Sequence, residues 1–442
     1  MHLKSTMEFS QDIAGVVKRS STPGAKISGS EGGTVSSSPK VLLADTNRWD
    51  LGARLAIGLG RIGCEVSAIC PSRGHALLVT HAVKRTFPYN VSNPLEALQT
   101  SIDAVNPDIV VPSCERSVEY LHQLHGRALK LGPVGQKTAR LIERSLGNPS
   151  GYRIVTSRYA LLAMAGEEGV RVPETTCISS SADLDLWRGS ESKSCVLKVD
   201  GTWGGGGVRV LRQKESPQAV WKDVTNTSQL SRAIKRLLVN RDPFYMREWL
   251  NRVERPIIAQ RFIEGRPANC TVFAWNGKVI ALIAVEVLRT EGATGPARVV
   301  RLIQNVEMQQ AADRIASRLG MSGFFGLDFM IENGTGRAYL IEMNARLTPP
   351  CYLRLEKGRD LVGAMWASVT GQPVPDHKPV TDSNTIAYQP QQLQNEDSSQ
   401  EWFYPLPEDE PELAHELENP FPNRTVLFRL VQLFDSKPAA AR

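Results

Sequence analysis

Two Asn-Gly dipeptides in the second half of the chain constrain its fold more than any other feature. Asn276–Gly277 and Asn333–Gly334 each lie between two runs of β-prone residues, and this arrangement is a strong signal of a tight hairpin. The flanking runs are residues 269–275 and 278–287 for the first turn, and residues 323–331 and 337–343 for the second. Paired strands are therefore predicted from residue 257 onward, with an amphipathic helix over residues 307–319 between the hairpins.

The first third of the chain shows a different pattern, in which short apolar runs alternate with helical periodicity. Strands are predicted at residues 41–44, 66–69 and 108–112, and helices near residues 51–62, 95–105 and 118–131. Strands that alternate with helices indicate a parallel sheet of Rossmann type. The G-x-G-x-x-G sequence that begins at Gly58 lies at the end of a helix, whereas a dinucleotide loop opens one, so we interpret it as a helix end and turn.

Composition excludes several classes of protein and function. The formal net charge of +6 over 442 residues is too small to indicate a nucleic-acid partner, and no apolar run approaches the length of a membrane span. The seven cysteines contain no Cys-x-x-Cys pair, so a disulfide framework and a zinc site are not expected and a reducing, cytoplasmic location is. His122 and His125 lack a ligand partner in sequence, and no metal site is predicted there.

Residues 1–38 are rich in Ser, Gly and Lys and are predicted to be a disordered tail, with a transit peptide as the alternative. Beyond about residue 372 the chain is rich in Pro, Gln, Glu and Asp, and only residues 424–434 look ordered.

A glycine-rich segment follows a predicted strand at residues 195–199. Gly204, Gly205, Gly206 and Gly207 are consecutive, so backbone N–H groups there can approach phosphate oxygens without side-chain obstruction. Lys198 leaves the preceding strand and can place its ammonium group on the same phosphates. A flexible surface loop is the alternative interpretation.

The second predicted hairpin brings acidic side chains together. If Glu332 pairs with Ala338, Asp328 lies directly opposite Glu342, with Cβ atoms about 5 Å apart. Asn344 shares the face of Glu342, and Gly326 stands opposite it. Facing carboxylates are destabilising unless a cation compensates them, and three oxygen ligands together with phosphate suit Mg²⁺. The alternative is a solvated acidic patch.

Three arginines follow or precede this cluster in the sequence. Arg346 comes two residues after Asn344, and Arg298 and Arg301 lie on a predicted strand. Guanidinium groups bind carboxylates and phosphates bidentately, and Arg346 and Arg301 are predicted to be catalytic together with Lys198. Ordinary surface charge is the alternative for each arginine.

Five motifs in this order resemble the ATP-grasp superfamily, of the type that joins a carboxylate to an amine or thiol. They are the Rossmann-like region, residues 169–174, Lys198 with its glycines, residues 260–265, and Asp328 with residues 342–346. The resemblance implies an α/β and α+β fold, in which a Rossmann-like pre-ATP-grasp domain precedes two ATP-grasp subdomains. The expected divisions are 39–140 for the first domain, 141–255 for the small subdomain and connection, 256–371 for the C-terminal subdomain, and 372–442 for an extension.

The same resemblance implies roles for individual residues. The nucleotide would contact Arg158, Lys198, the glycines and the hinge formed by Gln260, Arg261, Phe262 and Ile263, whose backbone reads adenine. Asp328, Glu342 and Asn344 would hold one or two Mg²⁺ ions, and Arg346 would face the acyl-phosphate or the substrate carboxylate. Three departures stand out: Arg158 replaces a frequent lysine, Gln260 replaces the usual hinge acid, and residues 347–350 replace familiar glycines.

The function expected from these features is an ATP-dependent ligase that activates a carboxylate as an acyl-phosphate for attack by an amine. Two alternatives remain open: an ATP-binding sensor or partner subunit without turnover, and a ligase with a thiol, bicarbonate or hydroxyl acceptor. The expected cofactors are ATP and Mg²⁺. The expected partners are a small-molecule carboxylate and an amine, with no nucleic acid and no membrane, and a homodimer is compatible with this interpretation.

Overall fold

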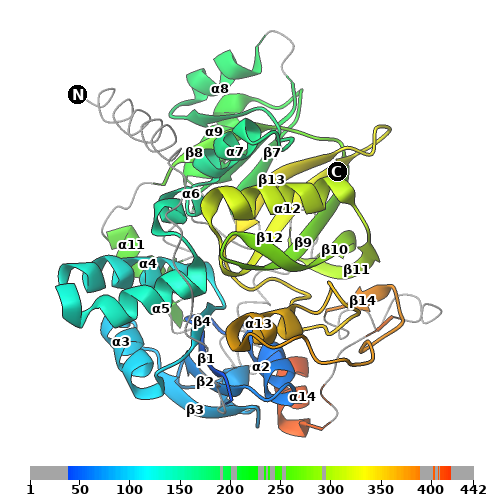
Figure 1. The fold of residues 1–442 in the computed structure, drawn as a ribbon. Coiled ribbons are helices and arrows are strands. Elements are labelled where there is room, and N and C mark those ends of the chain that lie inside the picture. The colour runs from blue at the N-terminus through cyan, green and yellow to red at the C-terminus, as the bar shows by residue number, and fades with distance from the viewer. Residues whose placement is uncertain are drawn as a thin grey trace.

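Three β-sheets form the framework of the chain (Figure 1). The computed structural model describes residues 38–189, 193–200, 207–226, 233–234, 237–238, 244–250, 255–290, 295–388, 402–403, 407 and 409–419. The N-terminal tail, the first three of the four consecutive glycines and residues 424–434 lie outside this described part. No described helix is long and apolar enough to cross a membrane.

The first sheet is parallel, with strand order β3-β2-β1-β4. Its strands are β1 (Lys40–Ala44), β2 (Glu65–Cys70), β3 (Val83–Pro88) and β4 (Ile109–Pro112), and its helices include α2 (Leu51–Arg61), α3 (Pro94–Val105), α4 (Glu115–Lys130) and α5 (Gln136–Leu146). The three predicted strands are confirmed, and Gly58 and Gly60 lie inside α2, as the interpretation of a helix end requires. The sequence did not reveal β3, because this edge strand is polar and largely exposed. Helix α5 packs on α4 and β4 and so carries this layer past residue 140.

The second sheet is small and antiparallel, with strand order β5-β8-β6-β7. It consists of β5 (Thr175–Ile178), β6 (Cys195–Val199), β7 (Val208–Leu211) and β8 (Ile257–Arg261), and it is contacted by α7 (Arg158–Glu167), α8 (Ser181–Arg188) and α9 (Pro217–Asn226). Helix α6 (Tyr152–Val155) leads into α7, and α11 (Phe244–Leu250) lies beside α4 of the N-terminal layer (Figure 1). Lys198 therefore lies on β6, and the segment from Gln260 to Ile263 begins on β8.

The third sheet has six strands in the order β13-β12-β9-β10-β11-β14. They are β9 (Gly265–Trp275), β10 (Lys278–Thr290), β11 (Ala297–Ile303), β12 (Gly323–Glu332), β13 (Ala338–Asn344) and β14 (Thr385–Ala387). Both predicted hairpins are present, and Asn276 and Gly277 take the positive φ angles, 51° and 79°, that favour this dipeptide at a tight turn. The expected α/β and α+β fold class is therefore confirmed.

The two faces of the six-stranded sheet pack against different helices. Helix α12 (Val306–Leu319) covers one face, and all six residues expected on its apolar side are buried. Helix α13 (Leu361–Thr370) covers the other face and also contacts α2, so the N-terminal layer and this sheet share one core (Figure 1). Phe324 belongs to the α13 side and Phe325 to the α12 side, which fixes the face of every other residue on β12 by alternation.

The C-terminal region corrects one expectation. Strand β14 extends the six-stranded sheet, and α14 (Pro411–Glu418) packs near the N-terminal layer, so order is present before residue 424. Both elements are short, and their surroundings are rich in Pro, Glu and Asp, which is why the composition hid them. The expected order at residues 424–434 lies outside the described residues.

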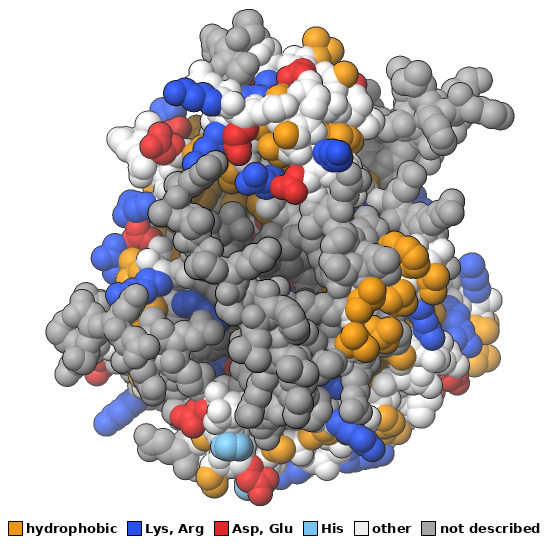
Figure 2. Space-filling view, turned by 180° about the vertical axis from the view of Figure 1, so that it is seen from behind, with side chains coloured by type: hydrophobic (Ala, Val, Ile, Leu, Met, Phe, Trp, Pro, Cys, Tyr) orange, Lys and Arg blue, Asp and Glu red, His pale blue; other side chains and the backbone are white. Residues whose placement is uncertain are grey.

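The surface shows no concentration of one kind of charge on the face displayed in Figure 2, where the described Lys and Arg side chains are interspersed with Asp and Glu. All seven cysteines lie in the described part of the chain, and each is a free thiol.

Gly326 of β12 packs closely against Thr348, next to the strand position of Asp328. A Cβ atom placed there would lie 2.5 Å from Thr348 Oγ1 and 2.6 Å from Thr348 Cγ2. We predict that Gly326→Ala lowers the free energy of unfolding by about 1–3 kcal/mol, because Thr348 is held by a 2.9 Å hydrogen bond to Thr271 and must shift. Urea unfolding measures this cost, which should shrink in a Thr348→Ala background.

Gly126→Ala is the matched control for this substitution. Gly126 lies inside α4 with nothing within 4 Å of the added methyl group, so the change should stabilise the protein by about 0.5–1 kcal/mol. Equal effects at the two glycines would contradict this account of the packing around Thr348.

Candidate functional site

Asp328 and Glu342 face each other across β12 and β13, as the register predicts. The pairing near the turn differs from the expectation: Ile331, and not Glu332, pairs with Ala338. A bulge between Asp328 and Phe329 absorbs the difference, because Phe329 pairs with Leu340 and Ile341 is the extra residue. The same bulge restores the expected opposition of Gly326 and Asn344.

Asp328 is a buried carboxylate whose nearest acidic neighbour, Glu342, outweighs the positive charge of Arg346 and Lys198. Burial, followed by the nearby Glu342 carboxylate, raises the pKa of Asp328 to about 6. The amide of Asn344 donates a 3.0 Å hydrogen bond to Asp328 Oδ2, which opposes part of this rise. A cation bound between these two facing carboxylates would therefore relieve their mutual repulsion.

Two basic residues from the small-sheet region reach the edge of the six-stranded sheet. Lys198 Nζ donates a 3.1 Å hydrogen bond to the carbonyl oxygen of Ile341, and Arg158 Nη2 donates one of 2.7 Å to Glu342 Oε1. Burial would raise the pKa of Glu342, but Arg158 and Lys198 outweigh it and hold that pKa below its ordinary value. Burial lowers the pKa of Lys198 itself to about 8.

Asp200 completes this group, and sequence reasoning assigned it no role. Its Oδ1 lies 3.3 Å from Arg158 Nη1, which also donates a 2.8 Å hydrogen bond to the carbonyl oxygen of Val199. Arg158 therefore bridges an acid of the small-sheet region and an acid of β13. The position of Asp200 two residues after Lys198, at the end of the same predicted strand, was the available signal in the sequence.

Arg346 lies at the junction with the N-terminal layer. Its Nε and Nη2 approach Glu115 Oε1 at 2.8 and 2.6 Å, and its Nη1 donates a 2.7 Å hydrogen bond to the carbonyl oxygen of Leu347. Nη2 also donates a 3.2 Å bond to Asn344 Oδ1, and the ring of Trp49 lies 4.5 Å from the guanidinium carbon. The guanidinium group is buried, so its position is fixed from several sides.

Arg301 is not brought to this cluster. It pairs with Glu286, to which its Nη2 donates a 2.6 Å hydrogen bond, and Arg266 binds the same carboxylate. Glu286 is in register with Ala268 and Phe329, whereas Asp328 is one residue away and points to the opposite face. Alternation along β11 places Arg298, not Arg301, on the face that carries Asp328.

The predicted adenine hinge forms the end of β8. Gln260 is buried, and its amide donates a 3.4 Å hydrogen bond to Thr175 Oγ1 on the paired strand. Arg261 Nη2 lies 3.4 Å from Glu174, Phe262 is exposed and Ile263 is buried. Of the four predicted loop glycines, Gly207 is described, and its carbonyl oxygen accepts a 3.0 Å hydrogen bond from the backbone N–H of Val199. Gly204, Gly205 and Gly206 lie outside the described residues.

The donor atoms of the acidic cluster fit a magnesium ion that is shared with phosphate. The described residues contain no group of three His, Cys, Asp or Glu side chains that could hold a metal ion by themselves. Asp328 and Glu342 supply two carboxylates, and burial together with the Glu342 carboxylate keeps the pKa of Asp328 raised although Arg346 and Lys198 lie near. Asn344 uses its amide to hold Asp328 and its oxygen to hold Arg346 in this structure.

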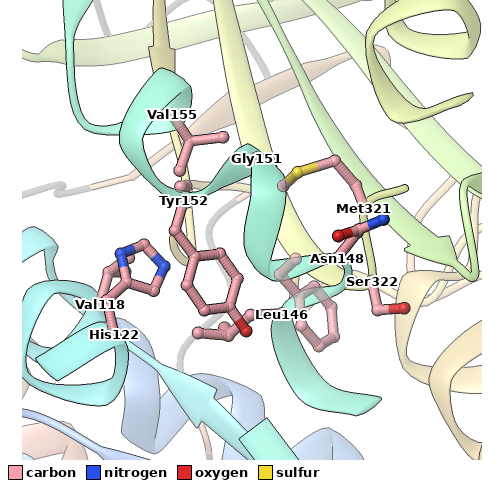
Figure 3. Close-up of a pocket in the computed structure, with 11 residues that line it drawn as sticks. Val118, His122, Leu146, Asn148, Gly151, Tyr152, Val155, Met321 and Ser322 are labelled. Atoms are coloured by element: carbon pink, nitrogen blue, oxygen red, sulfur yellow. The ribbon is translucent and has the colours of Figure 1, made fainter. Parts of the chain in front are cut away.

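A small pocket lies between α4 and the segment that follows β13, beside the candidate site (Figure 3). Its wall includes Ala345, between Asn344 and Arg346, together with His122 and Tyr152, whose rings stack with centroids 3.9 Å apart. Burial lowers the pKa of His122 to about 4, so its imidazole is neutral near pH 7. His125 is bonded to Glu143 at 2.8 Å. These histidines pack between elements.

Glu115 is the site residue that sequence reasoning missed most clearly. It opens α4 directly after β4, at the carboxyl end of a parallel strand. Parallel sheets place ligand-binding residues at such ends, at the point where the strand order reverses, so position in the predicted Rossmann-like sheet was the available signal.

Comparisons with known proteins agree with this geometry. Residues 156–350 match the family model described as ATP-grasp domain. Over 105 residues the chain is 31% identical to carbamoyl-phosphate synthase of Methanobrevibacter smithii, a match that covers 22% of this chain and 28% of that protein.

Solved structures extend the likeness to most of the chain, at the level of the fold. N5-carboxyaminoimidazole synthetase of Staphylococcus aureus, complexed with ADP, is 14% identical with a TM-score of 0.55, and the match covers 78% of this chain and 80% of that one. The biotin carboxylase domain of Hydrogenobacter thermophilus 2-oxoglutarate carboxylase is 16% identical with a TM-score of 0.54, covering 77% and 71%. The resemblance drawn from the five motifs is confirmed, and residues 156–350 of this chain are an ATP-grasp domain.

Proposed function

We propose that this chain is an ATP-dependent carboxylate–amine ligase that forms an acyl-phosphate and releases ADP and phosphate. The observation that carries the proposal is the facing pair Asp328 and Glu342, with Lys198 and Arg158 reaching it from the small-sheet region. Two facing carboxylates, beside basic groups from the small-sheet region, make a binding place for a metal–triphosphate complex.

The nucleotide is proposed to lie between the small sheet and the six-stranded sheet. Lys198, Arg158 and the glycines Gly204–207 would contact its phosphates, and the segment from Gln260 to Ile263 would contact adenine. Asp328 and Glu342, with Asn344 beside them, would hold Mg²⁺, which neutralises charge on phosphate oxygens when it is bound. Two structural neighbours support a nucleotide ligand, because one was solved with ADP and the other with MgADP and bicarbonate.

The chemistry follows from the weakness of a carboxylate as an electrophile. A carboxylate oxygen attacks the γ-phosphorus atom, the bond to the β-phosphate oxygen breaks, and ADP leaves. The amine then attacks the acyl carbon, and phosphate departs with the electron pair of the carbon–oxygen bond. The protein contributes positioning and charge neutralisation, and Lys198 and Arg346 are proposed to stabilise the transferred phosphoryl group.

The substrate carboxylate needs a basic partner on the face of the six-stranded sheet that carries Asp328. Arg298 shares this face by alternation, whereas Arg301 is bound to Glu286 on the other face. We therefore assign the role proposed for Arg301 to Arg298. A homodimer and a cytoplasmic location remain predictions.

Glu342→Gln is the variant that tests the ligase assignment. We predict at least about a 100-fold loss of ADP release in the presence of ATP, Mg²⁺ and pooled small carboxylates and amines, because the neutral amide no longer completes the metal site or pairs with Arg158. Coupled detection of ADP measures the rate, and mass spectrometry identifies the product. An ester, thioester or carboxylated product would reveal a different acceptor.

Glu332→Gln, at the other end of the hairpin, is the control with the same change of charge and should retain the wild-type rate. Full turnover by Glu342→Gln would refute the metal assignment. Tight ATP binding without ADP release from the wild-type protein, across all pools, would favour a sensor or partner subunit.

The raised pKa of Asp328 predicts how pH controls the metal. The folded protein binds the proton of this carboxyl group more tightly than the unfolded chain does. The stability that this proton contributes is therefore complete below the ordinary pKa of 3.8 and is lost as pH rises through about 6. Mg²⁺ needs the ionised group, so the gain in melting temperature from adding Mg²⁺ to the ADP-bound protein should be larger at about pH 7.5 than at about pH 5.

Asp328→Asn should remove most of this gain at both pH values. If the Mg²⁺-dependent rise in the melting temperature of the wild-type protein were independent of pH, Asp328 would not be a metal ligand.

A further inference from the structure

Arg158 joins two sheets of the molecule through a single guanidinium group. It is the first residue of α7, and 11% of its side chain is exposed. On one side, its Nη1 donates a 2.8 Å hydrogen bond to the carbonyl oxygen of Val199 and lies 3.3 Å from Asp200 Oδ1. On the other side, its Nη2 donates a 2.7 Å hydrogen bond to Glu342 Oε1 on β13. The planar fork of an arginine can serve these partners at once, whereas the single ammonium group of a lysine cannot.

Asp200 is anchored to the small-sheet region through its backbone. Its N–H donates a 2.9 Å hydrogen bond to the carbonyl oxygen of Pro256, and its own carbonyl oxygen accepts one of 3.3 Å from Arg255 Nη1. Its carboxylate also accepts a 3.4 Å hydrogen bond from the backbone N–H of Arg158. Burial raises the pKa of Asp200, and the guanidinium group of Arg158 opposes this rise. Asp200 is therefore a partner of Arg158 whose position is fixed independently of β13.

Glu342 is the partner of Arg158 that a metal ion at the candidate site would also need. It faces Asp328 across β12 and β13, and its Oε1 already accepts the hydrogen bond from Arg158. A magnesium ion held by both acids would lie about 2.0–2.1 Å from their oxygen atoms and would bring two positive charges to the carboxylate that Arg158 neutralises. Positive charges that share one carboxylate repel each other, so the guanidinium group and the metal are competitors for Glu342.

The formal charges of the site favour an exchange of partners. Three carboxylates and two basic groups meet here: Asp200, Asp328, Glu342, Arg158 and Lys198. Arg346 lies outside this balance, because Glu115 neutralises it. When all five groups are ionised they carry one negative charge in excess, and a divalent cation turns this into one positive charge in excess. Phosphate oxygens are suitable partners for that surplus, and Arg158 can supply it by leaving Glu342 and keeping Asp200.

We propose that Arg158 competes with a divalent cation for Glu342, and that Asp200 is the positioning residue that retains Arg158 when it yields Glu342 to that cation. This inference rests on the proposed function, because it takes Asp328 and Glu342 as metal ligands, and it deepens that function by giving Asp200 a role. Arg158 then turns its Nη2 from the carboxylate to a phosphate oxygen of the nucleotide. Metal binding and nucleotide binding are thereby coupled, since the cation releases the group that the phosphate needs.

Mn²⁺ is the probe for the competition, because the electron paramagnetic resonance signal of free Mn²⁺ falls as the ion binds. The full chain is titrated with Mn²⁺ in the absence of nucleotide, and then with ADP at a fixed concentration of Mn²⁺. We expect Arg158→Gln to bind Mn²⁺ alone at least about fivefold more tightly than the wild type, because the competitor is gone. The same variant should bind ADP at least about tenfold more weakly, because it lacks a phosphate contact. A merely structural role for Arg158 would weaken both affinities.

Asp200→Asn tests the positioning role through a double-mutant cycle. When Arg158 is present, the substitution should weaken the binding of ADP in the presence of Mn²⁺ at least about fivefold. In an Arg158→Gln background it should no longer weaken that binding, because Asp200 acts through Arg158. Equal weakening in both backgrounds would refute the positioning role.

Two further variants separate the competition from a loss of folding. Arg153→Gln removes the same charge from an exposed residue of α6 and should bind Mn²⁺ and ADP like the wild type. Arg158→Lys keeps the charge but not the fork, so it should also bind Mn²⁺ more tightly than the wild type and should lose less affinity for ADP than Arg158→Gln. If neither Arg158 variant bound Mn²⁺ more tightly than the wild type, the competition would be overturned.

The outcome is independent of turnover. Opposite shifts of the Mn²⁺ and ADP affinities in Arg158→Gln, without ADP release in any acid–amine pool, would leave the exchange and refute the ligase. ADP release that depends on Glu342, with no gain of Mn²⁺ affinity in either Arg158 variant, would leave the ligase and refute the exchange.

Discussion

Repulsion between two carboxylates on adjacent strands is the constraint on which the arrangement of the candidate site depends. The strand register keeps Asp328 and Glu342 opposite each other, because the other face of their strands packs in the core under α12 through Leu327, Phe329 and Met343. A register slip of one residue would turn these apolar side chains away from α12, to the face that now carries the two acids. The fold therefore holds the two acids together, and neighbouring elements supply the compensation.

That compensation comes from every sheet of the molecule. Arg158 and Lys198 arrive from the small-sheet region, and Arg346 is fixed by Glu115 from the parallel sheet. Removing one member of a buried ion pair leaves the other uncompensated, so these contacts tie the relative placement of the sheets to the chemistry at the acids. The same arrangement keeps Asp328 buried beside the Glu342 carboxylate, and the proposed metal site rests on this facing pair.

Local signals in the sequence were sufficient for much of the fold and for part of the site. The Asn-Gly turns defined both hairpins, and period-two alternation then placed Asp328 opposite Glu342 even though the assumed pairing of Glu332 was one residue off. A bulge at Ile341 corrected the register, and no sequence rule located that bulge. The same alternation separates Arg298 from Arg301, but only once the face of β11 is known.

Contacts between distant parts of the chain were beyond such reasoning. Glu115 and Arg346 are 231 positions apart, and nothing in their local sequence links them. The edge strands β3 and β14 were also missed, because a polar or very short strand derives its stability from the neighbour with which it pairs and carries little periodicity of its own.

The most direct test of the central claim is a crystal structure with a non-hydrolysable ATP analogue and Mn²⁺ in place of Mg²⁺, with the metal located by its anomalous scattering. We expect a peak within about 2.0–2.6 Å of oxygen atoms from both Asp328 and Glu342, beneath a triphosphate that contacts Lys198. A bound nucleotide whose metal lies away from these two carboxylates would contradict the account.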